Sequence, residues 1–380
     1  MKLGVNASRA RSGGALAHLA GFLGNARLEE AGISSIHVWS YPRLISMLPK
    51  TPWLVPHTPP YLERSLAWQM WWERFILPRE LEAEGCNILL NVDAASVCRF
   101  QPAVTMSRDM LSYEPGEIDR YGWSKARLRL IVLRHVQNAS LRAADGAVFL
   151  TRYAAGVIQS SCGQLSNVAH IPHGVGDAFR NVVPQHNWPT GGDRPIRCMY
   201  VSNALPYKHQ WHVVDAVARL RARSYDVHLE LVGGGEGPAQ VRLERQIARS
   251  DPEGKYVTQR EFVRQDSLPD FLARADLFVF ASSCENMPNT LVEAMAAGLP
   301  IACSNRGPMP EVLEDGGLYF DPESPEEITS ALERLISEPE LRIRLAARAK
   351  ELSAQYSWAR CARETFSFVG KTAEQAKSDN

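Results

Sequence analysis

Short apolar runs alternate with longer segments of helical periodicity along the whole chain. An apolar run of about four to eight residues is typical of a buried strand, and apolar positions at helical spacing indicate a helix that packs on one face. Strands that alternate with helices predict βαβ units and parallel sheets. The predicted strands are KLGVN, SSIHVWS, CNILLNV, GAVFL and NVAHIP in the first half, and RCMYVS, VHLELVG, DLFVFAS and LPIACS in the second.

A stretch without apolar periodicity separates the two series of strands. Residues 181–195, NVVPQHNWPTGGDRP, contain three prolines and two glycines, which is typical of a linker. The sequence therefore predicts an α/β protein with two facing, doubly wound, Rossmann-like domains, residues 1–180 and 196–356, and a cleft between them. Ligands of such sheets bind beyond the carboxyl ends of the strands, so the loops after the strands are the places to look for chemistry.

Composition narrows the classes of protein that fit. The 380 residues suit two domains, and 45% apolar with 22% charged residues is usual for soluble globular proteins. Forty-two basic and 42 acidic side chains leave no overall field that would attract nucleic acid. The seven cysteines lack a C-x-x-C pair, and no signal peptide or membrane span is recognisable. We therefore expect reduced thiols and a cytoplasmic protein.

The most informative stretch is CENMPNTLVEAMAAGLP, which follows the apolar run DLFVFAS. It holds two glutamates, Glu285 and Glu293. Proline fits only the first turn of a helix, so Pro288 excludes one continuous helix through both glutamates. We predict a helix that starts at about Pro288 or Asn289 and ends at Gly298. Glu285 then lies on the preceding loop, and Glu293 lies about one turn inside the helix.

The start of that helix is a candidate anion site. Backbone N–H groups near Asn289 and Thr290 point out of the helix end, where the dipole favours negative charge. Carboxylates beside a phosphate are poor phosphate ligands but good acceptors for the hydroxyls of an attached sugar. The pattern thus favours Glu285 and Glu293 as sugar-binding groups. The alternative is that Glu293 only complements the helix dipole and that Glu285 is solvated.

Three further loops after predicted strands hold groups that suit a sugar or a phosphate. Lys208 stands in a turn at a helix entrance, where it could neutralise a diphosphate leaving group or could simply be solvated. Asp109 lies where a strand ends, and it could bind acceptor hydroxyls or pair with Arg108. Gly234, within VGGGEGP, could let a base or ribose approach the backbone or could serve a turn.

A glycine pair follows the first predicted strand, in ASRARSGGALAHL. Backbone N–H groups at Gly13 and Gly14 could contact a phosphate or sugar, and a strand-to-helix turn explains the pair equally well. The spacing is not G-x-G-x-x-G, which argues against a NAD oxidoreductase.

These motifs resemble those of the retaining glycosyltransferases of family four, which have the GT-B fold, and are similar to those of bacterial lipopolysaccharide and polysaccharide-assembly enzymes. The segment from Ser283 to Pro300 looks like the E-x7-E signature of that family, and EVLEDGGLYFDPESPEEI is similar to the run that closes its second domain. IPHGV, the Lys208 turn and LELVGGGEGP also agree. Residues 357–380 resemble a C-terminal helix that crosses back to the first domain, with a polar tail.

The resemblance implies roles for the candidate residues. Glu293 would hold the ribose hydroxyls of the nucleotide donor, and Glu285 would hold the donor sugar near its reacting carbon. Lys208 would stabilise the departing diphosphate, and Asp109 would lie near the acceptor. The other expected donor-binding residues are Gly13, Gly14, Asn203, Gly234, Met287, Asn289 and Thr290. No metal or other cofactor is expected, because the family usually needs none and the sequence shows neither a D-x-D motif in a credible loop nor a His/Cys cluster.

The chain departs from the family pattern at three places. Residues 202–203, Ser-Asn, replace a common Gly-Arg pair, so a cationic partner of the diphosphate is missing unless Arg9 or Arg11 substitutes. Residues 286–288, Asn-Met-Pro, replace Gly-Phe-Gly, and proline cannot donate an N–H. Residues 108–109, Arg-Asp, replace a His-Asp pair.

The resemblance implies a nucleotide-sugar-dependent hexosyltransferase that acts with retention on a glycan or polyprenyl-linked acceptor. Two alternatives stay open. An epimerase of the same fold would act on the donor without an acceptor, and a sugar-nucleotide-binding subunit without turnover would fit the missing arginine. A phosphorylase would be expected to be much longer.

Two segments of the first half bear on membrane contact. Residues 124–142, SKARLRLIVLRHVQNASLR, combine an apolar stripe with basic side chains. Such a helix can lie on an anionic membrane, where a lipid-linked acceptor would be, or can be an ordinary surface helix. Trp68, Trp71 and Trp72 could add membrane or acceptor contacts, although core packing would explain at least one of them.

Overall fold

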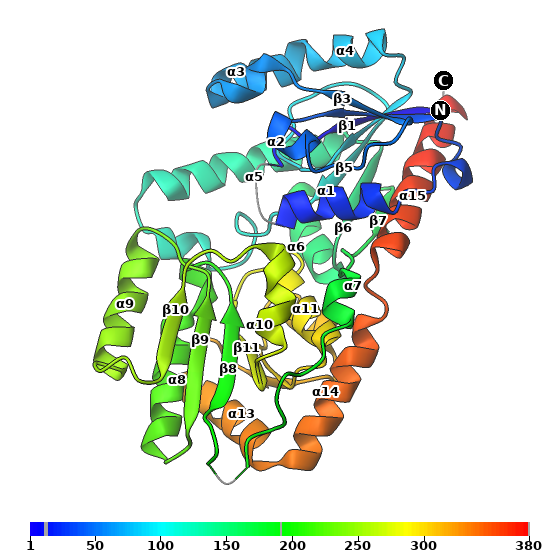
Figure 1. The fold of residues 1–380 in the computed structure, drawn as a ribbon. Helices are drawn as coiled ribbons and strands as arrows, with labels where there is room; N and C mark the ends of the chain where they lie inside the picture. Colours follow the sequence, from blue (N-terminus) through cyan, green and yellow to red (C-terminus); the bar gives the residue numbers. More distant parts are fainter. Residues whose placement is uncertain (11–13, 191, 379–380) are drawn as a thin grey trace. The chain divides into compact units, whose positions relative to one another are not determined.

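The computed structural model describes residues 1–10, 14–190 and 192–378. Contacts divide the chain into two units, each a parallel sheet with helices packed on it (Figure 1). The first unit comprises Met1–Gly174 with Tyr356–Asn380, and the second comprises Val175–Gln355. The predicted boundaries at residues 180, 196 and 356 stay predictions. By contacts, the chain passes from the first unit to the second after Gly174 and returns at Tyr356.

The first unit is built on a seven-stranded sheet of order β3-β2-β1-β4-β5-β6-β7, in which every pairing is parallel. Its strands are β1 (Lys2–Asn6), β2 (Ser35–Trp39), β3 (Leu54–His57), β4 (Ile88–Asn91), β5 (Ala103–Ser107), β6 (Gly146–Phe149) and β7 (Val168–His170). Its helices are α1 (Gly14–Gly24), α2 (Pro42–Ile45), α3 (Leu66–Phe75), α4 (Leu77–Ala83), α5 (Lys125–Ala143), α6 (Arg152–Cys162) and α15 (Trp358–Ser378).

Helix α15 joins the first unit through close contacts at glycines. A Cβ atom at Gly21 would lie 2.4 Å from the indole of Trp358, and one at Gly146 would lie 2.9 Å from the ring of Phe368. Real Cβ contacts are never this short, so a larger residue at either glycine would push the helix away from the sheet. Glycine at these positions therefore lets the last helix pack against α1 and β6.

The second unit has a six-stranded parallel sheet of order β10-β9-β8-β11-β12-β13. Its strands are β8 (Ile196–Val201), β9 (Val227–Val232), β10 (Val257–Arg260), β11 (Leu277–Phe280), β12 (Ile301–Ser304) and β13 (Leu318–Phe320). Its helices are α7 (Asp177–Arg180), α8 (Gln210–Ala222), α9 (Pro238–Ser250), α10 (Leu268–Leu272), α11 (Asn289–Ala297), α12 (Met309–Leu313), α13 (Pro325–Ser337) and α14 (Pro339–Ser353).

The segment predicted as a linker is tied to the second unit. Arg194 donates two hydrogen bonds to the carboxylate of Asp276, at 2.6 and 2.8 Å. The backbone N–H of Gln185 donates to the carbonyl of Ala273 at 2.8 Å, and the guanidinium of Arg342 lies 3.5 Å above the ring of Trp188.

The predicted α/β class with two doubly wound parallel sheets is confirmed. Strand order reverses between β1 and β4 in the first sheet and between β8 and β11 in the second. Such reversal points open a crevice at the carboxyl ends of the strands, where ligands bind in folds of this kind. None of the helices in the part of the chain that the structure describes is long and apolar enough to cross a membrane.

Candidate functional site

The reversal point of the second sheet brings two predicted site loops together. Strands β8 and β11 pair directly, so the loops that follow them leave the same edge. The backbone N–H of Ser283 donates to the carbonyl of Tyr207 at 2.8 Å, and the hydroxyl of Ser283 lies 2.9 Å from Nε2 of His209. Residues that are about 75 positions apart in sequence thus form one hydrogen-bonded rim.

Lys208 and Glu285 form an ion pair on this rim. Their side chains are only 13% and 15% exposed, and the Lys208 ammonium lies 5.2 Å from the ring centre of Tyr207 and 5.7 Å from that of Phe280. Neither residue is the solvated surface charge of the alternative interpretation. The pair places the Lys208 ammonium beyond the carboxyl end of β8 and the Glu285 carboxylate beyond the end of β11.

The turn that presents Lys208 is held in an unusual conformation. His209 is fully buried and adopts φ 48°, a left-handed conformation that is uncommon for residues other than glycine. The hydroxyl of Tyr200 donates to the carbonyl of Lys208 at 2.7 Å. These contacts fix the backbone, so that Lys208 has only side-chain freedom. The sequence analysis missed both supporting residues: the partner of His209, Ser283, is 74 positions away, and Tyr200 lies within the apolar run of β8.

Helix α11 begins and ends as predicted. Pro288 is its N-cap, Asn289 its first residue, and Gly298, at φ 76°, its left-handed C-cap. The Thr290 hydroxyl donates to the carbonyl of Val201, the last residue of β8, at 3.3 Å. The N-terminus of the helix is therefore anchored at the edge that carries Lys208, and its dipole adds positive potential there. Met287 lies buried in the turn just before it.

Glu293 is buried within α11 and differs from Glu285 in its surroundings. Its carboxylate accepts a hydrogen bond of 2.5 Å from Nε2 of Gln265. Burial raises the pKa of Glu293 to about 8, and the Gln265 hydrogen bond only partly opposes this shift. The Glu293 carboxyl group therefore carries a proton near neutral pH until further hydrogen-bond donors, in addition to Gln265, reach it. Gln265, on a polar loop without periodicity, gave no sequence signal.

In the glycine loop after β9, Gly233 allows close packing and Gly234 leaves open space. Gly233 adopts φ 113°, and a Cβ atom there would lie 2.4 Å from the carbonyl oxygen of Ser202. The backbone N–H of Ala204 donates to the carbonyl of Gly234 at 3.1 Å. A Cβ atom at Gly234 would meet only atoms 3.8 Å or more away. Gly233 is thus required by packing, whereas Gly234 leaves space. Asn203 lies exposed between these loops.

Asp109 lies in the first unit, just beyond β5. Its carboxylate accepts hydrogen bonds from the backbone of Leu111 at 3.1 Å and from Gln137 at 3.3 Å. Burial raises the pKa of Asp109 above its ordinary value. Arg108 forms its ion pair with Asp93, at 3.8 Å. The structure therefore gives Asp109 hydrogen-bonded partners of its own, and its contact with an acceptor stays a prediction.

The remaining candidates of the first unit lie near β1. Gly14 is the first residue of α1, and Gly13 and Arg11 lie outside the described residues. Arg9 forms an ion pair of 2.9 Å with Glu73, which is fully buried. Arg9 is therefore already paired within its own unit. This argues against Arg9 as the substitute for the arginine that the family pattern has at position 203.

A polar network that sequence reasoning missed surrounds this arginine. The side-chain amide of Asn6 donates to Glu73 at 2.7 Å and to Asn91 at 3.0 Å. Asn6 ends β1 and Asn91 ends β4, so the network marks the reversal point of the first sheet. Glu73 lies on α3, and it was not predicted as a site residue because the surrounding residues are mostly apolar at helical spacing.

Two parallel Rossmann-like sheets with this topology are typical of the GT-B fold. The sucrose-phosphate synthase of Thermosynechococcus elongatus superposes on the whole chain with a TM-score of 0.75 and 17% identity, and the match covers 100% of both chains. Residues 188–352 match the family "Glycosyl transferases group 1". This segment lies within the second unit, and for this segment the resemblance inferred from the sequence is confirmed.

Curated relatives match part of the chain. A GDP-mannose-dependent alpha-(1-6)-phosphatidylinositol monomannoside mannosyltransferase of Mycobacterium tuberculosis is 27% identical over 255 residues, which cover 62% of this chain and 63% of that protein. An O-antigen chain mannosyltransferase B of Escherichia coli is 27% identical over 167 residues, 44% of each chain. The chain thus spans less than two thirds of the length of these relatives.

Proposed function

We propose that the protein is a retaining hexosyltransferase that uses a nucleotide-diphosphate sugar and acts on a hydroxyl of a glycan or lipid-linked acceptor in cell-surface polysaccharide synthesis. The observation that carries this proposal is the Lys208–Glu285 pair beside the N-terminus of α11. Both partners stand at the reversal point of a group 1 glycosyltransferase domain. The name of the Mycobacterium tuberculosis relative makes GDP-mannose the first donor to test, and the Escherichia coli relative is also named a mannosyltransferase.

In the proposed cycle, donor binding exchanges the partner of Lys208. The ammonium leaves the Glu285 carboxylate and contacts the diphosphate, which carries more negative charge. Glu285 is thereby freed to accept hydrogen bonds from hydroxyls of the donor sugar, while the positive end of the α11 dipole faces the diphosphate. The backbone N–H of Asn289, predicted as a free donor, already donates to the carbonyl of Met287 at 3.0 Å. The ion pair of the free protein holds both groups ready, so little reorganisation is needed when the ligand arrives.

We propose front-face displacement for the chemical step. The bond between the anomeric carbon and the diphosphate oxygen breaks, and the acceptor oxygen bonds to that carbon from the same face. The acceptor proton passes to a diphosphate oxygen. Lys208 and the α11 dipole stabilise the charge that develops on the leaving group. Because these groups supply the positive charge, we propose that transfer needs no metal at this site.

The proposed roles of Glu293 and Asp109 complete the picture. Glu293 accepts hydrogen bonds from the ribose hydroxyls of the donor, and its proton passes to solvent when the donor binds. Asp109 contacts the acceptor hydroxyl from the first unit. Asn203 leaves the diphosphate with one cation fewer than the family pattern provides.

A donor and acceptor panel tests the proposal. Nucleoside diphosphate release is measured with a panel of nucleotide sugars, with and without a polyprenyl-linked glycan. We expect release from one donor only when the acceptor is present, and a product whose anomeric configuration, read by NMR, matches that of the donor. A nucleotide sugar whose configuration changes without an acceptor and without release would indicate an epimerase, and binding without release or change of the donor would indicate a subunit that lacks turnover. A product of opposite configuration would exclude retention.

We also propose peripheral contact of the first unit with an anionic membrane. The exposed face of α3 carries Trp68, Trp71 and Phe75, each at least 41% exposed. The rings of Trp68 and Trp71 lie 5.7 Å apart, and the guanidinium of Arg64 lies 5.4 Å from Trp68. Aromatic rings flanked by arginines suit the interface between lipid tails and anionic headgroups. Trp72, in contrast, is fully buried, which confirms that core packing explains one of the three tryptophans.

Vesicle flotation tests the membrane contact. The wild-type protein is expected to float with vesicles that contain phosphatidylglycerol, and the Trp68→Ser/Trp71→Ser variant is expected to stay at the bottom of the gradient. Phe262→Ser removes an aromatic side chain that is 83% exposed in the second unit, so it serves as the matched control and should float. Equal flotation of all three proteins would exclude the α3 surface.

A further inference from the structure

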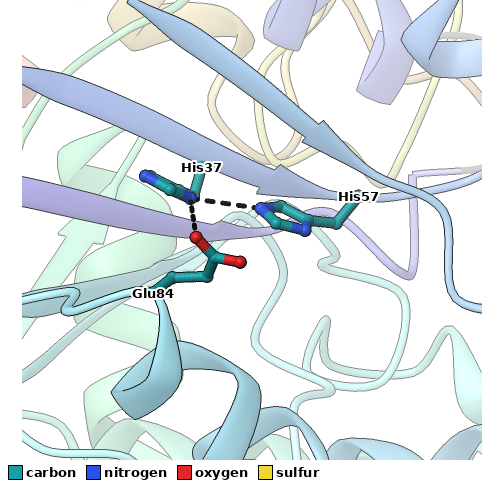
Figure 2. A group of neighbouring side chains, drawn as sticks. All are labelled: His37, His57 and Glu84. Atoms are coloured by element: carbon teal, nitrogen blue, oxygen red, sulfur yellow. Dashed lines mark hydrogen bonds and ion pairs between the residues drawn. The ribbon is translucent and has the colours of Figure 1, made fainter.

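Two histidines and a glutamate of the first unit converge from three elements (Figure 2). His37 belongs to β2, His57 ends β3, and Glu84 caps the C-terminus of α4. Nδ1 of His37 lies 3.1 Å from Nε2 of His57 and 3.4 Å from a carboxylate oxygen of Glu84. Within the described ranges of the chain, this is the one group of three such side chains whose ligand atoms all lie within 4.8 Å of one another.

The fold itself brings these side chains together. In the parallel pairing of β2 with β3, His37 lies opposite Val55 and Trp39 lies opposite His57. Because side chains alternate along a strand, both histidines point to the same face of the sheet. On the neighbouring strand β1, Gly4 pairs with His37. A Cβ atom at Gly4 would lie 2.3 Å from Leu81 of α4, so only glycine lets this helix come close.

The three groups are held in place before any ligand binds. The ring of His57 stacks on Trp39, with centres 4.3 Å apart and an angle of 8°. The Lys2 ammonium donates to the backbone carbonyl of Glu84 at 3.0 Å. His37 is buried, whereas the Glu84 side chain is 41% exposed, so one side of the cluster faces solvent. Orientation by neighbours that do not touch the ligand is typical of metal sites.

The ligand set points to a class of metal. Two imidazole nitrogens and one carboxylate oxygen suit Zn²⁺ and its transition-metal neighbours better than Mg²⁺ or Ca²⁺, which prefer oxygen ligands. Tetrahedral bonds of about 2.0 to 2.1 Å place ligand atoms roughly 3.3 Å apart, close to the two separations given above. We propose that His37, His57 and Glu84 bind one divalent transition-metal ion, Zn²⁺ being the best suited, with solvent as the fourth ligand.

The charge balance of the cluster supports a cation. Glu84 contributes negative charge at the C-terminus of α4, where the helix dipole is also negative. Lys2 is the opposing positive group. The ion would connect the edge strand β3 and its neighbour β2 to α4.

Titration of the chelator-treated full chain with Zn²⁺ tests this site by calorimetry. The wild-type protein should bind Zn²⁺, and His57→Gln and Glu84→Gln should each weaken the affinity by about 100-fold or more, since the loss of a neighbour that only orients a ligand already costs about 10- to 100-fold. His135→Gln, an exposed histidine on α5, is the matched control and should bind like the wild type. Both test positions are partly exposed, and circular dichroism checks that the variants fold.

Thermal unfolding supplies a second measurement. Zn²⁺ should raise the unfolding midpoint of the wild type and the control, and it should raise that of the two variants much less, because an ion that binds only the folded state stabilises it. A wild-type protein that binds no Zn²⁺, or folded variants that bind as tightly as the wild type, would overturn the proposal. Neither result depends on transferase activity, so the site is tested separately from the proposed function.

Discussion

At the scale of single residues, the candidate site rests on charges that are partly withdrawn from water. Lys208 and Glu285 satisfy each other in the free protein, whereas Glu293 is buried with an amide partner, Gln265. Lys208 and Glu285 can exchange each other for groups of the donor. The Glu293 carboxyl group, which has no charged partner among the contacts described above, can exchange a proton. The two glutamates of one short motif therefore have different physical chemistry, which their spacing alone did not reveal.

Removing one partner of the ion pair should cost both stability and turnover. Lys208→Met leaves the Glu285 carboxylate poorly solvated, and we expect a loss of about 1 to 3 kcal/mol in the free energy of unfolding, since the pair keeps some access to water. The double variant Lys208→Met/Glu285→Gln should recover much of that loss and remain inactive. Urea unfolding and turnover assays check this. A double variant as unstable as Lys208→Met would contradict the pairing.

Glu293 predicts a particular pH dependence of stability. Its pKa in the folded protein is raised from 4.5 to about 8, so the native state keeps a proton that the unfolded chain loses. Relative to Glu293→Gln, the wild type should lose stability as pH rises from about 4.5 to 8, by up to about 1.4 kcal/mol per pH unit, and should lose no more above that range. Denaturant unfolding across this range, with Glu285→Gln as the control, measures the difference. If the free energies of unfolding of the wild type and Glu293→Gln changed in parallel with pH, a raised pKa of Glu293 would be ruled out.

At the scale of elements, the loops after the strands determine the geometry of the site. Gly233 closes the β9 loop against the β8 loop, and Gly234 leaves room beside it. We expect Gly233→Ala to destabilise the second unit by about 1 to 3 kcal/mol, since it forces a Cβ atom onto a carbonyl and strains the backbone. Gly234→Ala should leave stability almost unchanged and raise the KM for the donor. Equal thermal stability of the two variants would refute this distinction.

Elements with a strong apolar pattern were predictable from sequence, including the edge strand β7, whereas the edge strands β3 and β10 were not. β1, β8 and β11 were found because their residues are apolar and almost all buried. β3 and β10 end their sheets and read LVPH and VTQR, in which a proline or polar residues break the pattern. The proline argument placed the start of α11 correctly, because that signal is local.

Side chains that act through distant partners were beyond sequence reasoning. Lys208 and Glu285 were proposed one by one, each from its place after a strand, and the structure showed that they meet. His209, Gln265 and Glu73 were missed, because a buried polar residue on a helix or loop has no pattern of its own. The His37–His57–Glu84 group was missed for the same reason, since its members lie on two strands and a helix end.

At the scale of the whole molecule, both units follow one rule. Each sheet reverses its strand order once, and each reversal point gathers charged and amide side chains, with Lys208 and Glu285 in the second unit and Arg9 and Glu73 in the first. The same topology thus provides two polar sites on one chain. Only the second lies within the matched group 1 glycosyltransferase domain, which is why the account places donor chemistry there.

The most direct test is acceptor-dependent release of nucleoside diphosphate from GDP-mannose or the best donor of the panel, compared between the wild type and Lys208→Met at saturating donor. The account predicts turnover by the wild type that requires the acceptor. In Lys208→Met, kcat should fall about 100-fold or more, because the leaving group loses its cation. Turnover by Lys208→Met at the wild-type rate, or a wild type that releases no nucleotide from any donor, would contradict it.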